Sequence, residues 1–191
     1  MKFDFKNISD MKKTLLMIVL MLSVVMANAQ EEHMKFAGIP LNGTIDRFQS
    51  KLIAKGYKSN SYLNKRLPKG TRAFDGTFAG EKADVAVYYN ETSKIVYGAK
   101  AYFDNLTEEK AKDKLENFKL LLKQKYYDGE FSEGEHNNYP SFEITTYLGA
   151  VYGYLNKNAD LEGYPYHFSV HLEYYDTKNA RKYQNSLMDD L

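Results

Sequence analysis

The sequence of 191 residues is nearly neutral, with 26 basic and 25 acidic residues, and 43% of it is hydrophobic. Because it has no basic tract, its charge gives no basis for binding nucleic acid or an anionic membrane surface. It contains no cysteine, which excludes disulfides, thiolate metal ligands and a cysteine nucleophile.

The N-terminal segment has the order of a secretory signal peptide. Lys12 and Lys13 precede an apolar run from Leu15 to Met26, and Ala27-Asn28-Ala29 follows as a small-residue cleavage pattern. The run is about a dozen residues, whereas a membrane-spanning helix needs roughly 20. We therefore expect cleavage near Ala29 and a secreted or periplasmic mature chain that does not insert into a membrane. Met11 opens this segment, so residues 1–10 would belong to a misassigned start.

Removal of residues 1–29 takes away four lysines and two aspartates, which leaves 22 basic and 23 acidic residues. The remaining residues 30–191 are enough to bury about two thirds of the surface of the chain in one folded domain. Since no disulfide is possible, the stability of this domain must come from a packed core.

The first half of the mature chain reads as a helix followed by strands. Ile45, Phe48, Leu52 and Ile53 fall on one helical face and Gly56 gives a stop, so we predict a helix over residues 45–55. Residues 59–71 are polar and are typical of a loop or an irregular edge. Alternating and β-branched residues then predict three strands, over residues 72–78, 83–89 and 95–103.

The second half repeats this order. Thr107 caps a predicted helix that runs to Lys125, with apolar residues at helical spacing. Residues 128–140 are rich in Gly, Glu and Asn, which favours an exposed loop. Strands are predicted over 142–147, 151–155 and 166–175, and a final helix over 177–187.

Two segment pairs suggest an internal repeat. Lys51–Tyr57 is similar to Leu121–Tyr127, and Tyr102–Asp104 is similar to Tyr174–Asp176, both at an offset of about 70 residues. The predicted fold is therefore α+β, with possible repeats over 36–104 and 105–176. Each repeat would be a helix plus an antiparallel three-stranded meander, with both helices on one face of a shared antiparallel sheet.

The last predicted strand alternates between two kinds of residue. Phe168, Val170, Leu172 and Tyr174 would face the core, and the intervening His167, Ser169, His171 and Glu173 would face water. His167 and His171 would lie about 13 Å apart at strand spacing, too far to share one zinc ion. We therefore interpret this side of the strand as a solvated face without a metal site.

Motifs that carry chemistry are missing from the sequence. It has no nucleophile elbow, zinc-protease helix, EF-hand loop or dinucleotide fingerprint. The acidic residues of 128–136 match no calcium-loop spacing. We assign no catalytic residue, metal or cofactor, and we leave open whether the chain is an enzyme while favouring that it is not.

Tyrosine is in excess, with 17 residues and adjacent pairs at 88/89, 126/127 and 174/175. Adjacent strand residues face opposite sides, so one member of a strand pair should be partly exposed. Exposed tyrosines are enriched at interfaces, although tyrosine also favours strands for its own sake. The candidate binding residues are Tyr88, Tyr89, Tyr97, Tyr102, Tyr174 and Tyr175.

The segment from Phe36 through Gly43, Phe48, Leu52 and Gly56-Tyr57, followed by Phe74-x-Gly-x-Phe78-Ala-Gly80, resembles small secreted Bacteroidetes proteins of uncharacterised function. The tandem order of helix and meander also resembles the fold of the β-lactamase-inhibitor protein. That resemblance implies a sheet face that grips a protein partner, but it carries over no inhibitory residue, and the inhibitor's disulfides have no counterpart in this chain.

Two functions remain as hypotheses. The first is a non-enzymatic binding module that holds a protein partner on a tyrosine-rich sheet face. The alternative is a cell-envelope enzyme or carbohydrate-binding protein with a site on inter-strand loops. A concave pocket with converging carboxylates or histidines would favour the alternative.

Overall fold

An antiparallel sheet organises the part of the chain that the computed structural model describes, residues 32–158 and 167–188. The predicted signal peptide lies outside these residues. The strands are β1 (Lys35–Phe36), β2 (Ile39–Pro40), β3 (Lys58–Ser59), β4 (Thr71–Phe78), β5 (Glu81–Tyr89), β6 (Val96–Leu106), β7 (Glu130–His136), β8 (Tyr139–Thr145), β9 (Gly149–Lys157) and β10 (Phe168–Asp176). The helices are α2 (Ile45–Ala54), α3 (Ser61–Asn64), α4 (Glu108–Lys125) and α5 (Thr177–Met188).

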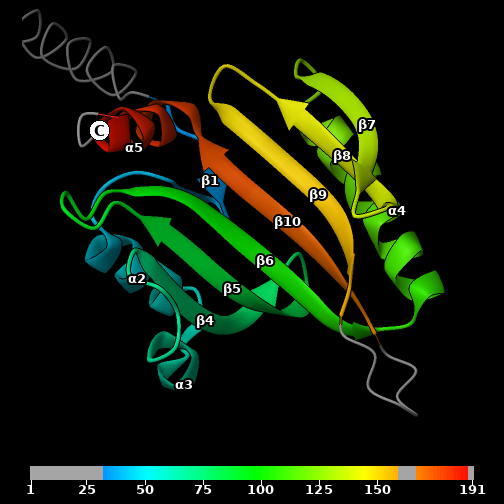
Figure 1. Ribbon diagram of the computed structural model, residues 1–191, viewed down its shortest axis with the longest axis horizontal. Coiled ribbons are helices and arrows are strands. Elements are labelled where there is room, and N and C mark those ends of the chain that lie inside the picture. The colour runs from blue at the N-terminus through cyan, green and yellow to red at the C-terminus, as the bar shows by residue number, and fades with distance from the viewer. Residues whose placement is uncertain (1–31, 159–166, 189–191) are drawn as a thin grey trace, which may run out of the picture. The chain divides into compact units, whose positions relative to one another are not determined.

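Eight strands form the main sheet, in the order β3-β4-β5-β6-β10-β9-β8-β7 (Figure 1). Every neighbouring pair in it is antiparallel. The strands of the first half of the chain therefore occupy one side of the sheet and those of the second half the other, and β6 meets β10 in the middle. The predicted α+β class with an antiparallel sheet is confirmed.

Helices α2 and α4 cover one face of the sheet (Figure 1). Most of the apolar residues that predicted them are buried, with Phe48 and Leu52 in α2 and Leu115 and Phe118 in α4, whereas Ile53 of α2 is 49% exposed. Thr107 caps α4 as expected, because its side chain accepts a hydrogen bond from the Lys110 amide at 3.3 Å. Within the described ranges no helix has both the length and the apolar character needed to cross a membrane.

The short hairpin of β1 and β2, each two residues long, packs an aromatic ring into the core on the helix side of the sheet. Ala37 and Gly38 both have positive φ, 49° and 75°, which matches the mirror-image turn that suits a tight hairpin. The turn places Phe36 in the core, where its ring lies 4.8 Å from that of Phe78 and 5.4 Å from that of Tyr174. The hairpin therefore ties the start of the described chain to both halves of the sheet.

The prediction of an exposed loop over residues 128–140 is wrong. Residues Glu130–His136 form β7, which pairs with β8 along its whole length. Asn137 and Asn138 form the turn, with φ of 50° and 68°, and asparagine tolerates this conformation well. Because β7 is an edge strand, most of its residues face water and only Phe131 packs against the core. The polar composition of β7 is therefore similar to that of a loop.

The predicted three-stranded meanders are not what the structure contains. Four strands follow α4, because β7 precedes the three that were predicted, and four follow α2, because β3 pairs with β4. The predicted loop over 59–71 also contains helix α3, which Asn60 caps by accepting a hydrogen bond from the Leu63 amide at 3.0 Å. Each long helix is thus followed by four strands.

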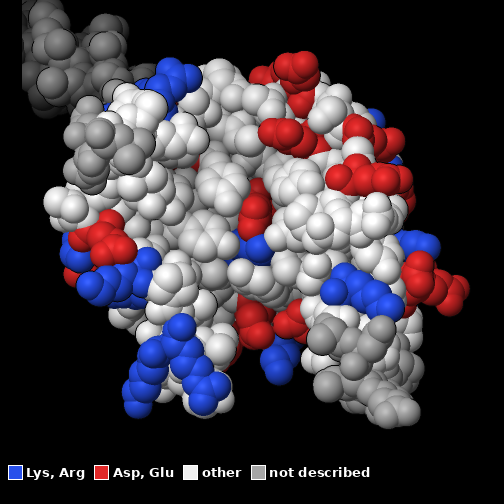
Figure 2. Space-filling view, in the orientation of Figure 1, with Lys and Arg blue, Asp and Glu red and all other residues white. Residues whose placement is uncertain are grey.

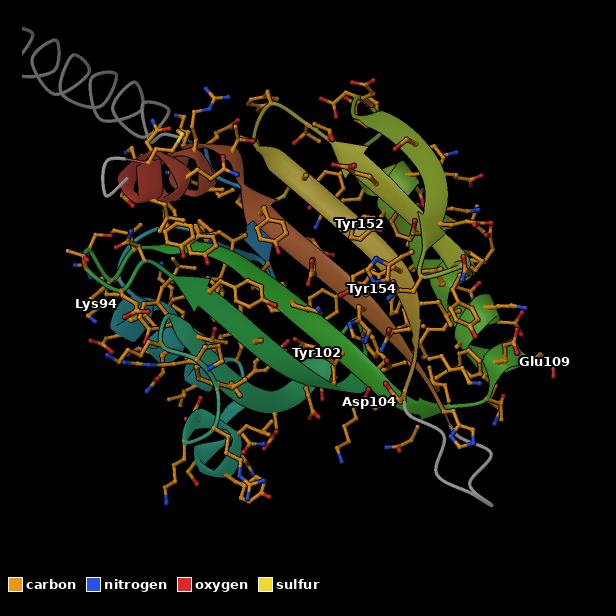
Figure 3. All side chains as sticks on the ribbon, in the orientation of Figure 1. Lys94, Tyr102, Asp104, Glu109, Tyr152 and Tyr154 are labelled. Atoms are coloured by element: carbon orange, nitrogen blue, oxygen red, sulfur yellow. The ribbon has the colours of Figure 1, made fainter. Side chains whose placement is uncertain are left out.

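Among the described residues, no long helix crosses the second face of the sheet, and we call it the open face (Figures 1 and 2). Tyr102 of β6 and Tyr152 and Tyr154 of β9 lie on this face in Figure 3. Its centre is mostly uncharged, whereas acidic side chains gather over β7 and β8 (Figure 2).

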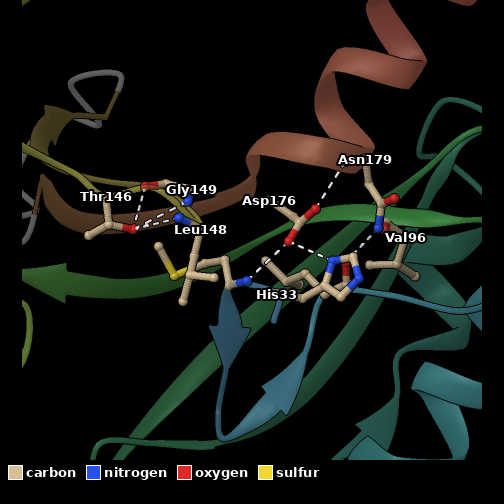
Figure 4. Close-up of polar contacts among 9 residues, drawn as sticks. His33, Val96, Thr146, Leu148, Gly149, Asp176 and Asn179 are labelled. Atoms are coloured by element: carbon tan, nitrogen blue, oxygen red, sulfur yellow. Dashed lines mark hydrogen bonds and ion pairs between the residues drawn. The ribbon is translucent and has the colours of Figure 1, made fainter. Parts of the chain in front are cut away.

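One buried carboxylate joins α5 to the N-terminal part of the domain (Figure 4). Asp176 is fully buried and caps α5 by accepting a hydrogen bond from the Asn179 amide at 2.9 Å. Its other oxygen accepts from the Met34 amide at 3.0 Å and lies 2.9 Å from Nδ1 of His33. The Asp176 side chain thus connects the first turn of α5 to the residues that precede β1.

We expect Asp176→Ala to lower the free energy of unfolding by about 3 kcal/mol, because it removes a helix cap and leaves buried donors unpaired. Urea unfolding of this variant and the parent protein measures the loss. Asp113→Ala, at an exposed position of α4, is the control and should change stability by less than about 0.5 kcal/mol. Equal stabilities for the two variants would contradict the assigned role.

Candidate functional site

Strand alternation directs a set of polar and aromatic side chains onto the open face. In β6, Ala99 and Ala101 are fully buried beneath the helices, so Lys100 and Tyr102 point the other way. In β10 the core residues Leu172 and Tyr174 alternate with side chains that reach the open face. These are His171, Glu173 and Tyr175.

Four tyrosines form a continuous row on this face, which we call the tyrosine row. Tyr175 and Tyr88 are stacked with ring centroids 6.3 Å apart, and Tyr88 and Tyr97 are stacked at the same distance. Tyr97 in turn stacks on Tyr183 of α5 at 4.6 Å. All four rings are half-buried, because each covers part of its neighbour and leaves the rest exposed.

Gly98 makes room for the row. It lies opposite both Tyr88 and Tyr175 in the sheet. A Cβ at this position would stand 2.9 Å from Cδ1 of Tyr175 and 3.1 Å from the Tyr174 carbonyl oxygen. The Tyr175 ring can therefore lie flat over the strand only because residue 98 has no side chain.

An ion pair lies at the centre of the open face. Lys100 and Glu173 are directly opposite in β6 and β10, and their Nζ and Oε1 atoms are 2.5 Å apart. Both side chains are largely buried, 10% and 15% exposed, so the solvent screens the pair far less than a surface pair. Tyr175 extends the network by donating to the second carboxylate oxygen of Glu173 at 3.2 Å.

The network continues from the ion pair through Tyr154. Lys100 donates to the Tyr154 hydroxyl at 2.5 Å, and this hydroxyl lies 3.2 Å from Nδ1 of His171. Ser169 lies 2.7 Å from Nε2 of the same imidazole. With its proton on Nδ1, a neutral His171 donates to Tyr154 and accepts from Ser169, so both contacts are satisfied. We call Lys100, Glu173, Tyr154, His171 and Ser169 the polar cluster.

Burial sets the protonation states in the polar cluster. Burial, with the nearby Lys100 and His136, lowers the pKa of His171 from 6.5 to about 3. Burial also acts to lower the pKa of Lys100, but its hydrogen bonds to Glu173 and Tyr154 outweigh this, and the pKa lies above its ordinary value. Burial raises the pKa of Tyr154. At neutral pH the cluster therefore holds one ion pair, a neutral imidazole and a protonated phenol.

The contact of Ser169 with His171 has the spacing of a nucleophile and its base, but the surroundings do not suit catalysis. Ser169 is fully buried and His171 is 8% exposed, so a substrate carbonyl has no access to the hydroxyl. A base with a pKa of about 3 is also far from the operating pH at which general bases work best. The geometry fits a structural network.

One edge of the open face is acidic. Asp75 and Asp84 lie directly opposite each other in β4 and β5, and burial followed by repulsion from Asp75 raises the pKa of the Asp84 carboxyl. Asp104 lies near the end of β6 on the same side (Figure 3). In residues 32–158 and 167–188, no three His, Cys, Asp or Glu side chains are placed to hold a metal ion.

The structure brings four of the six candidate tyrosines together and separates two. Tyr88, Tyr97, Tyr102 and Tyr175 reach the open face. Tyr174 is 2% exposed and packs in the core under the helices, and Tyr89 lies on the helix side, near Arg72 and Lys94. Strand alternation explains the separation, because adjacent residues point to opposite faces.

The prediction that the polar side of β10 is a solvated face is wrong. Ser169 and His171 are buried, because rings from neighbouring strands cover them: those of Tyr102 and Tyr154 lie 4.9 Å and 4.7 Å from the imidazole. Aromatic side chains of the neighbouring strands thus cover the polar side of β10. The residue pattern of β10 alone does not reveal this burial.

Sequence reasoning missed several members of this face. Tyr152, Tyr154 and Tyr183 were not among the candidates, and the pairing of Lys100 with Glu173 could not be predicted because it depends on the register between distant strands. Tyr152 and Tyr154 do alternate within one strand, which is a signal that could have found them.

Comparison with family models, with characterised proteins and with solved structures finds no match for this chain. The geometry of the chain itself therefore carries the functional argument.

The depressed pKa of His171 predicts how stability depends on pH. As the pH falls through 6.5, His171 becomes protonated in the unfolded chain, whereas in the folded chain it stays neutral until about pH 3. The contribution of His171 to the free energy of unfolding is therefore fully present above pH 6.5 and is lost progressively as the pH falls below it. This residue alone should cost about 2 kcal/mol between pH 7.5 and pH 5. Urea unfolding at both pH values measures this loss, and His171→Gln should remove the part of the pH dependence that is due to His171. Proton NMR should show an imidazole that stays neutral at pH 5; a midpoint near 6.5 for this signal would refute the assignment.

The central ion pair should behave as a unit. Lys100→Met leaves a buried carboxylate unpaired and should lower the free energy of unfolding by about 3 kcal/mol, whereas adding Glu173→Gln should recover part of this loss. Urea unfolding of the two single variants and the double variant gives the coupling. Lys112→Met is the matched control, since its pair with Glu108 is half exposed and is worth about 0.5 kcal/mol at most. Additive losses would show that the pair is not coupled.

Proposed function

We propose that this chain is an exported, non-enzymatic binding module that holds a protein partner on the open face of its sheet. The observation that carries the proposal is the tyrosine row, in which half-buried rings stack from Tyr175 to Tyr183 across the face. Stacked rings hold their conformations before a partner arrives, so binding costs little side-chain entropy. Tyrosine also supplies contact area and a polar hydroxyl together.

The charges of the face indicate which partner fits. Its centre is aromatic, and the ion pair of Lys100 with Glu173 is already satisfied within the polar cluster. Asp75, Asp84 and Asp104 lie at one edge, and the acidic side chains of β7 and β8 lie at another (Figure 2). A partner with basic side chains around an apolar or aromatic centre complements this pattern, and salt should weaken its binding.

We also propose that the two halves of the fold are a duplicated unit of one helix and its strands. The mirrored strand order, with β3 to β6 on one side and β10 to β7 on the other, supports this idea. A duplicated unit would also fit the proposed resemblance to the β-lactamase-inhibitor-protein fold, which concerns the architecture and a sheet face that holds a protein partner. Export rests on the predicted signal peptide alone.

The alternative, an enzyme or carbohydrate-binding protein with a site on inter-strand loops, has less support. The described cavity lies on the helix side of the sheet, and the residues that line it include no Asp, Glu or His. The contact of Ser169 with His171, which resembles a nucleophile and its base, is buried in the polar cluster. We therefore place the binding module first.

The test compares capture by matched variants. The purified protein and a Tyr97→Ser/Tyr102→Ser variant are each exposed to envelope and culture-fluid extract of the producing cell, and the affinity for any captured protein is then measured. We expect the variant to bind at least about tenfold more weakly, since two half-exposed interface tyrosines are lost. Tyr62→Ser/Tyr127→Ser removes two exposed tyrosines away from the face, 61% and 87% exposed, and should bind like the parent.

Two results would count against the open face. One is a captured partner whose affinity is the same for the parent and the Tyr97→Ser/Tyr102→Ser variant, with both shown to be folded by their unfolding transitions. The other is binding that rises with salt, because an acidic rim that attracts a basic partner predicts the opposite.

A further inference from the structure

A second candidate site lies on the opposite side of the sheet. Between the β1–β2 hairpin, the end of β4 and helix α4 is a cavity of about 460 Å³, which is within the size range of small-molecule sites. Its apolar walls come from both halves of the fold. They include Phe78, Phe118, Leu121, Leu122 and Leu172.

The charged residues that line this cavity are all lysines. Lys35 comes from the hairpin, Lys55 follows α2 and Lys125 ends α4. All three are exposed, so they form a rim around the apolar walls. The ammonium of Lys55 reaches over the hairpin turn, 3.7 Å from where a Cβ at Gly38 would stand.

Within the part of the chain that the structure describes, these lysines have no partner of opposite charge. Among residues 32–158 and 167–188, no carboxylate forms an ion pair with Lys35, Lys55 or Lys125. Other lysines of α4 do form such pairs, for example Lys112 with Glu108 and Lys119 with Glu133. The rim is therefore a concentration of uncompensated positive charge in a protein that is nearly neutral.

We propose that this cavity binds a free long-chain carboxylate, with the acyl chain among the apolar walls and the carboxylate among the three lysines. An apolar cavity with a cationic rim complements a molecule that is apolar along its length and anionic at one end. At roughly 30 Å³ for each water-sized group, the cavity of about 460 Å³ holds about fifteen such groups, which is enough for a carboxylate with a chain of about a dozen carbons.

The test is calorimetric titration of the purified protein with dodecanoate below its micelle concentration. Dodecanoate should bind in a one-to-one ratio, and each methylene removed from the chain should weaken binding by about fourfold. Dodecyltrimethylammonium has the same chain with the opposite charge and should bind at least about tenfold more weakly. Naphthoate, a rigid aromatic carboxylate, should also bind more weakly.

Matched variants separate the rim from the walls. The triple change Lys35→Gln, Lys55→Gln and Lys125→Gln should weaken dodecanoate binding at least about tenfold and should not weaken dodecyltrimethylammonium binding. The control Lys65→Gln, Lys69→Gln and Lys110→Gln changes the net charge equally at exposed positions outside the cavity lining, and should leave affinity nearly unchanged.

Leu121 and Leu120 give a second comparison, since they are 60% and 58% exposed and only Leu121 lines the cavity. Leu121→Ser should weaken binding severalfold, whereas Leu120→Ser should not. The proposal is overturned if dodecanoate does not bind, if the triple variant binds it as tightly as the parent, or if naphthoate binds as tightly as dodecanoate.

Discussion

The antiparallel pairing of β6 with β10 is the constraint on which the rest of the structure depends. It joins strands about seventy residues apart and makes one sheet of the two halves of the chain. Its register also decides the chemistry of the open face, because it sets Gly98 against Tyr175, Lys100 against Glu173 and Tyr102 against His171. A slip of one residue would turn these side chains to the wrong face.

The two faces of the sheet exclude water in different ways. The helix side is covered by α2, α4 and the β1–β2 hairpin, and its core is apolar. The open face uses its own side chains as cover: tyrosine rings shield an ion pair and a neutral histidine whose polar atoms bond to one another. A buried polar group destabilises the fold unless it has a hydrogen-bond partner. Because the polar atoms of this cluster bond to one another, they can be shielded from water although no helix among the described residues packs over them.

Much of the fold could be predicted because its signals are local. The apolar spacing of Phe48 and Leu52, and of Leu115 and Phe118, defines both long helices within a few turns of chain. β7 could not be recognised, because an edge strand buries little and Glu130–His136 therefore has the composition of a loop. The local sign of a hairpin in this segment is Asn137-Asn138, which lies close to glycines and glutamates that are typical of a loop.

The candidate site was only partly predictable, since it is built from contacts between distant strands. Adjacent tyrosines indicated that one member of each strand pair would reach the open face, and Tyr88 and Tyr175 do so. The alternation of β10 also placed Tyr174 in the core correctly, yet it could not reveal that Tyr102 and Tyr154 cover His171. Burial of one strand by side chains of its neighbours becomes visible only when the register is known.

The two proposed sites share β10 but should act independently. Leu172 and Tyr174 line the cavity on one side of this strand, and His171, Glu173 and Tyr175 lie on the other. Coupling between sites needs an element with two arrangements that both ligands bias. β10 is paired with β9 along all nine of its residues and with β6 along most of them, so it has little freedom to move. In the two proposals, the opposite charges of the two rims, acidic on the open face and basic around the cavity, would instead attract two different ligands to opposite sides of one small domain.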